Sequence, residues 1–191
     1  MSGIIAVAVF IVSIVFSLII FSLWLRMALR YLRISAVHPV SQLIYKMTNP
    51  IVNPIQLVFK QKYQPGQKYD IPALIVLIIV EILKIISISL LTFHTILPIR
   101  LVLVYVFADL IIQPCDILFF AILFRVIMSF VNPRWQGPVA DFLRLLTEPV
   151  LKLVRRFIPD IAGFDFSPFI IMLLLKMITL FINASLPWRI L

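Results

Sequence analysis

The sequence predicts an all-α membrane protein in which four transmembrane helices form two tandem parallel repeats. The composition, four apolar segments of membrane-spanning length and an internal repeat all lead to this prediction. Hydrophobic residues make up 63% of the 191 residues and charged residues 13%, whereas a soluble domain is about half apolar and about a quarter charged. The composition therefore excludes a disordered chain and argues against an ordinary water-soluble enzyme.

Four segments are long and apolar enough to cross a bilayer, whose hydrocarbon core of about 30 Å needs roughly 20 helical residues. These segments are rich in β-branched residues, which would favour strands in water. In lipid, however, an open strand leaves its backbone groups without hydrogen-bond partners, so we expect helices. The expected spans are residues 3–25, 71–93, 101–124 and 168–186.

The basic residues indicate how the chain is oriented. Seventeen Lys and Arg stand against eight Asp and Glu, and most of the basic residues lie in two long loops, 26–70 and 125–165. Because cytoplasmic loops are enriched in Lys and Arg, we expect both loops inside and both termini outside a bacterial inner membrane. The first span lacks the basic start and the cleavage site of a signal peptide, so it is expected to stay uncleaved. No nucleic acid is expected as a partner, because the basic residues flank membrane spans.

The two halves of the chain resemble each other in sequence. The tetrapeptide Thr-Asn-Pro-Ile at 48–51 matches Thr-Glu-Pro-Val at 147–150. This pattern predicts repeats over 1–98 and 99–191, each with two spans and the same orientation, related by an axis along the membrane normal. Three pairs of equivalent polar residues are Arg26 with Arg125, Thr48 with Thr147, and Asp70 with Asp165.

Each long loop is expected to hold an amphipathic helical hairpin at the cytoplasmic interface. The stretches that begin at Pro39 and Pro138 place apolar residues on one helical face, and Pro50 and Pro149 are expected to break or kink the chain after them. These apolar faces either cover the helix bundle or contact lipid, or do both. Anionic lipid headgroups are the expected partners of the basic side chains. The residues assigned to this interface are Lys152, Arg155, Arg156, Arg26 and Arg125.

Charged and polar side chains also lie inside the expected spans, where ionisable groups are candidates for function. They are Glu81, Lys84, Asp109, Gln113, Asp116 and Lys176. Depths estimated at about 1.5 Å per helical residue permit the pairs Asp116–Lys176, Asp109–Lys84 and Glu81–Lys176, and Glu81 can also pair with Lys84 on its own helix. Three interpretations stay open: structural contacts between helices, an ion or proton path, and a site that faces a partner.

The sequence contains no standard set of catalytic or metal-binding residues. One cysteine, two distant histidines and four glycines leave no metal-ligand spacing, no nucleotide-binding loop and no Ser-His-Asp set. We therefore expect no enzymatic activity, no cofactor and no metal site.

Residues 146–159 read Leu-Thr-Glu-Pro-Val-Leu-Lys-Leu-Val-Arg-Arg-Phe-Ile-Pro, and residues 163–168 read Gly-Phe-Asp-Phe-Ser-Pro. Together they resemble the hallmark motif of the YggT family of YlmG-related membrane proteins. The resemblance covers nearly the whole chain, and the first copy departs from it at His38 and where Gln56 and Leu57 replace an arginine pair. The motif residues are Thr147, Glu148, Pro149, Pro159, Gly163, Asp165, Ser167 and Pro168.

The resemblance implies a bacterial inner-membrane protein that supports osmotic-stress tolerance or ion homeostasis and is associated with transport. Relatives in plastids and cyanobacteria imply an alternative, a non-transporting anchor or assembly factor for a membrane or division complex. No enzymatic activity is implied. A homo-oligomer and a membrane-protein partner both remain open.

Overall fold

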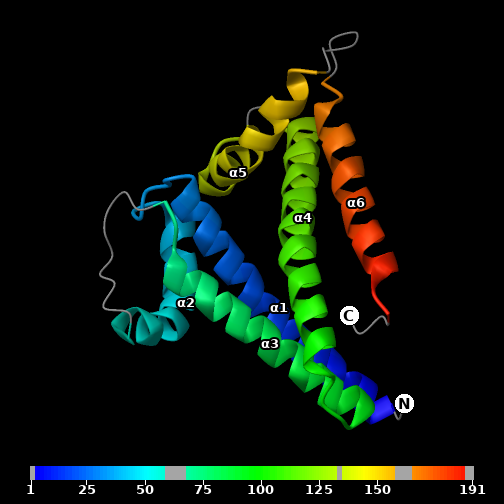
Figure 1. Cartoon of the computed structure of the whole chain (residues 1–191). Helices are drawn as coiled ribbons and strands as arrows, with labels where there is room; N and C mark the ends of the chain where they lie inside the picture. The colour runs from blue at the N-terminus through cyan, green and yellow to red at the C-terminus, as the bar shows by residue number, and fades with distance from the viewer. Residues whose placement is uncertain (1–2, 59–67, 133–134, 158–164, 188–191) are drawn as a thin grey trace. The chain divides into compact units, whose positions relative to one another are not determined.

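The computed structural model describes residues 3–58, 68–132, 135–157 and 165–187, and these residues fold into helices without strands. The prediction of an all-α protein is therefore confirmed for the described residues. Figure 1 shows the described helices coloured in chain order. They are α1 (Gly3–Tyr31), α2 (Pro39–Val58), α3 (Ile71–Phe93), α4 (Ile99–Val131), α5 (Pro138–Arg155) and α6 (Ser167–Ser185).

Helices α1, α3, α4 and α6 are long and apolar enough to cross a membrane. Helix α3 has the predicted bounds, whereas α1 continues six residues beyond the predicted end at position 25 and α4 seven residues beyond position 124. The predicted ends were set by the first arginine after each apolar run, Arg26 or Arg125. Arginine is a good helix former, so both helices continue through it.

Each long loop contains one described helix, α2 or α5, in place of the hairpin that the sequence analysis expects. Pro50 lies inside α2 and Pro149 inside α5, with no break at either proline. In α2 the buried residues Ile44, Thr48 and Val52 follow one another at four-residue intervals on both sides of Pro50. Burial of this continuous face offsets the cost of the backbone hydrogen bond that is lost at the proline.

The chain divides into two compact units, residues 1–110 with 186–191 and residues 111–185. The division lies within α4, so that the first unit holds α1 to α3 with the start of α4. The second unit holds the rest of α4 with α5 and α6. The repeat boundary at 98/99 stays a prediction from the sequence.

In the first unit, α1, α2 and α3 share one apolar core. Ile20 and Leu23 of α1 pack with Val52 of α2 and with Ala73 and Leu77 of α3. The opposite side of α1 is exposed and apolar along its length, as expected of a helix that faces lipid. This core fixes the end of α1 against the start of α3, and both places carry the charged residues described below.

The second unit has its own core. Ile122 of α4, Leu151 of α5, and Ile171 and Leu175 of α6 form a buried cluster. Leu151 follows Pro149 by two residues, so the part of α5 after the proline is also held against the core. The same packing places the start of α6 next to the end of α5.

Candidate functional site

Three charged residues within the helices of the first unit form one buried group, the buried trio of Glu81, Lys84 and Asp109. Lys84 Nζ lies 2.9 Å from Asp109 Oδ2 and 3.7 Å from Glu81 Oε2, and the three side chains are 0–5% exposed. Glu81 and Lys84 are three residues apart on α3, and Asp109 comes from α4. The packing of Ile85 of α3 against Tyr105 of α4 holds the two helices together beside the trio.

The second unit contains a simpler charged pair. Lys176 Nζ of α6 lies 2.7 Å from Asp116 Oδ1 of α4, and the two side chains are 38% and 36% exposed. The Lys176 ammonium also lies 4.6 Å from the centre of the Phe119 ring. Gln113, on the same helix one turn before Asp116, is half-buried.

Three of the pairings that the sequence analysis permits are therefore confirmed: Asp116–Lys176, Asp109–Lys84 and Glu81–Lys84. The fourth, Glu81–Lys176, joins residues of different units and stays a prediction. The two charged groups differ in composition, because the trio has two carboxyls for one ammonium whereas the pair is balanced.

A further set of polar residues ties the three helices of the first unit together at one end; we call it the first arginine cluster. Arg26 donates from Nε to Asp70 Oδ2 over 2.9 Å, and from its terminal nitrogen to Thr48 and Asn49 over 2.8 Å each. Arg30 lies 3.0 Å from the same Asp70 oxygen. Arg26, Arg30, Thr48 and Asp70 are buried, so the cluster fixes α1, α2 and the start of α3 against one another.

The second unit contains an equivalent arrangement, the second arginine cluster. Arg125 of α4 donates to Thr147 and to Glu148 of α5 over 2.8 Å each. Arg155, at the end of α5, lies 3.2 Å from Glu148 and 2.6 Å from Asp165. Thr147 is buried, but the four charged side chains are 24–37% exposed, so the second cluster is more open than the first.

The carboxyls of the second cluster have lowered pKa values. Burial raises the pKa of Glu148, but the hydrogen bond and charge of Arg125, together with the charge of Arg155, outweigh it, and the net pKa lies below the ordinary value. Burial likewise raises the pKa of Asp165, but hydrogen bonds from Ser167 and Arg155 outweigh it, and the net pKa lies below the ordinary value. Both carboxylates are therefore held in the ionised form at neutral pH.

The internal repeat aligns the key residues of these clusters, but their contacts were not predicted from the sequence. The pairs Arg26 and Arg125, Thr48 and Thr147, and Asp70 and Asp165 stand out in the repeat, and each repeat brings an arginine onto its threonine. The 22-residue spacing from arginine to threonine, which is the same in both copies, was the signal that could have found these contacts. The excess of basic residues in the two long loops instead predicted that these arginines contact lipid headgroups.

The basic residues assigned to the lipid interface differ in their surroundings. Arg26, Arg125 and Arg155 donate to protein oxygens, and Arg26 is buried. Lys152 and Arg156 are exposed. Contact with lipid headgroups stays a prediction for all five.

The motif residues concentrate in and beside the second arginine cluster. Thr147, Glu148 and Asp165 form it, and the Ser167 backbone N–H donates to Asp165 Oδ1 over 2.9 Å. Pro149 lies inside α5, and Pro168 lies in the first turn of α6. Pro159 and Gly163 fall outside the described residues.

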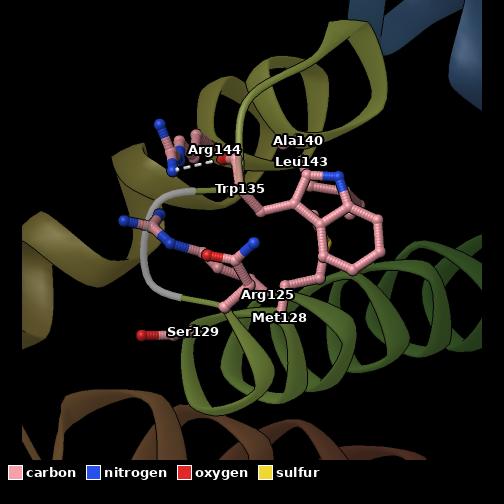
Figure 2. A pocket seen from close by; sticks show the side chains of 8 residues that line it. Arg125, Met128, Ser129, Trp135, Ala140, Leu143 and Arg144 are labelled. Carbon is pink, nitrogen blue, oxygen red and sulfur yellow. Dashed lines mark hydrogen bonds between the residues drawn. The ribbon is translucent and has the colours of Figure 1, made fainter.

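A polar cavity of about 220 Å³ lies beside the second cluster, between the end of α4 and the start of α5. Figure 2 shows the Trp135 indole beside Met128 and Leu143, and Arg144 donating to the Trp135 backbone oxygen over 3.1 Å. Arg125 and Arg144 both line this cavity, and because Arg125 is paired with Glu148, the excess positive charge there comes from Arg144. Among the described residues no group of three or more His, Cys, Asp or Glu side chains could hold a metal ion.

The described part of the chain defines a class of protein: it is helical, four of its helices can span a membrane, and charged side chains pair within the spans and at their ends. The CCB3/YggT family model matches residues 5–91 and 104–186, and the chain belongs to this family. No solved structure matches it.

Relatives in three bacteria resemble the chain over most of their length. The uncharacterized protein YggT of Escherichia coli is 31% identical over 174 residues, which cover 90% of this chain and 86% of the relative. An uncharacterized protein of Pseudomonas aeruginosa is 27% identical over 97% of this chain and 93% of its own length. One from Haemophilus influenzae is 30% identical over 83% of this chain and 80% of its own length.

Proposed function

We propose that the protein is a multi-pass protein of the bacterial inner membrane that supports ion homeostasis and osmotic-stress tolerance in association with ion transport. The observation that carries the proposal is the buried trio. Ionisable groups at membrane depth are costly, and where they occur they often mark ion or proton pathways. A balanced pair would suffice to join two helices, but the trio places a second carboxyl in the same buried position.

In the proposed architecture these charges lie within two tandem parallel repeats, and both termini are outside the membrane. Two observations support the repeat: in each half an equivalent arginine donates to an equivalent threonine, and the family model matches the chain over two separate segments. The orientation rests on the basic loops 26–70 and 125–165.

The experiment is complementation of a strain that lacks the gene, followed by growth after an osmotic shift. Variant Lys84→Met removes the cation of the buried trio, and Asp141→Asn is a matched control at an exposed position on α5. With membrane abundance equal by immunoblot, wild type and Asp141→Asn should restore growth and Lys84→Met should not. Full rescue by Lys84→Met would contradict the proposal.

A second candidate function is a non-transporting anchor or assembly factor that holds anionic lipid at the inner face of the membrane. The arginine-lined cavity favours it, because Arg144 forms no ion pair with the described residues and faces a polar space beside Trp135. Native mass spectrometry should then show that Arg144→Gln retains less phosphatidylglycerol or cardiolipin than the wild type. Unchanged lipid retention, together with loss of osmotic growth in Lys84→Met, would favour the first function.

A further inference from the structure

The buried trio contains one carboxyl more than its lysine can balance. Two carboxylates and one ammonium would leave a net charge of −1 on side chains that are 0–5% exposed. A buried charge without a counter-charge is so unfavourable that the group takes up or loses a proton instead. The trio therefore needs a further positive charge to be stable in this buried position.

The described helices of the first unit do not supply that charge. Helix α1, which packs against α3, has no ionisable side chain between positions 3 and 25. Lys84 is the one basic residue in the sequence of α3. In the part of α4 that belongs to this unit, Arg100 lies nine residues from Asp109, about 14 Å along the helix at about 1.5 Å per residue, and it is exposed. Tyr105, which is buried beside Ile85, is a neutral phenol at neutral pH.

The two carboxyls are also close to each other. Both share one ammonium, because Lys84 Nζ lies 2.9 Å from Asp109 Oδ2 and 3.7 Å from Glu81 Oε2. An ionised carboxylate can only accept hydrogen bonds, so two of them in contact repel, whereas one protonated carboxyl can donate to the other. When two carboxyls share one buried site, one of them binds a proton much more tightly than an isolated carboxyl does.

We propose that the buried trio is a proton-binding site in which Glu81 carries one proton at neutral pH while Asp109 and Lys84 stay ionised. Lys84 Nζ is closer to Asp109 than to Glu81, at 2.9 Å against 3.7 Å, so its charge stabilises the Asp109 carboxylate more strongly. A proton from water forms the O–H bond on Glu81, and the net charge of the trio changes from −1 to zero. The proposal goes beyond the proposed function, since the trio would hold this proton whether or not the chain moves ions.

The second unit supplies a control. Asp116 and Lys176 balance each other and are about a third exposed, so this pair needs no proton. A substitution of Asp116 therefore changes a carboxylate within a span without changing the proposed site.

Infrared spectroscopy of the full chain in lipid nanodiscs tests the proposal, because a protonated carboxyl has a C=O stretching band apart from those of carboxylates and amides. The chain contains two glutamates, Glu81 and Glu148, and the second is held ionised by Arg125 and Arg155. At neutral pH the wild type should show this band, and labelling the glutamate side-chain carboxyls with ¹³C should shift it. Absence of the band, or a shift on labelling aspartate instead, would overturn the proposal.

Variants complete the test. Glu81→Gln and Asp109→Asn each leave one carboxyl for Lys84, so both should lose the band, whereas Asp116→Asn should keep it. Lys84→Met should strengthen the band, because both carboxyls would then be neutralised by protons. Persistence of the band in Glu81→Gln would contradict the proposal. Its loss on adding sodium at constant pH would indicate a metal-ion site and would also overturn it.

Discussion

Replacing Asp70 with asparagine should destabilise the protein strongly, because Asp70 is the carboxylate that both arginines of the first cluster share. Its side chain is fully buried, with Arg26 Nε 2.9 Å away and a terminal nitrogen of Arg30 3.0 Å away. Asparagine is as good an N-cap as aspartate, so the hydrogen bond from the Ala73 N–H can survive. The substitution therefore removes the negative charge between the two arginines while it leaves the N-cap of α3 in place.

Removal of one partner from a buried ion pair typically costs about 3–5 kcal/mol, and we expect Asp70→Asn to lower the free energy of unfolding by this amount. The control is Asp165→Asn at the equivalent position of the second cluster, where the side chains of Asp165 and Arg155 are 30% and 37% exposed. Exposed pairs contribute about 0–1 kcal/mol, so this variant should change little. Unfolding of both variants in mixed micelles, followed by circular dichroism, gives the comparison. A loss in Asp165→Asn as large as in Asp70→Asn would refute the reasoning.

Three further predictions concern other parts of the molecule. In a double-mutant cycle, Asp116→Asn and Lys176→Met should couple by about 0.6 kcal/mol, as polar contacts between membrane helices do on average, and additive effects would argue against their contact. Because the pKa values of Glu148 and Asp165 are lowered, these carboxylates stabilise the fold above their unfolded-state pKa. That stability should be lost as the pH falls below about 4.5, the ordinary glutamate value. When stability is followed as the pH is lowered, Glu148→Gln should lose less stability than the wild type. An unchanged dependence of stability on pH would count against this prediction. In a cysteine-free background, Gln42→Cys on α2 should react with an impermeant thiol reagent only in inside-out vesicles, and labelling of intact cells would reverse the orientation.

Helix type and position were predictable from the sequence because they depend on local properties. The apolar runs determine the four long helices, and the expected span 71–93 has the bounds of α3. The charges within the runs were equally visible, since depth along a helix follows from residue number. The pairs Asp109–Lys84 and Asp116–Lys176 could therefore be predicted before any contact was known.

Contacts that depend on how separate elements pack could not be predicted in this way. Arg26 follows an apolar run, as residues that bind headgroups do, but the folded chain brings Asp70 to it from 44 positions later. The sequence could not decide between a break and a kink at Pro50 for a similar reason, and α2 continues through this proline. The buried face that sustains the helix forms only when Val52 packs against α1 and α3.

Ion flux into liposomes that contain the purified protein tests most directly whether the charges within the helices serve ion balance. The wild type and the exposed-site control Asp141→Asn should move monovalent cations faster than protein-free liposomes do, and Glu81→Gln should reduce that flux. Flux no greater than in protein-free liposomes, or equal flux in Glu81→Gln and the wild type, would contradict the account.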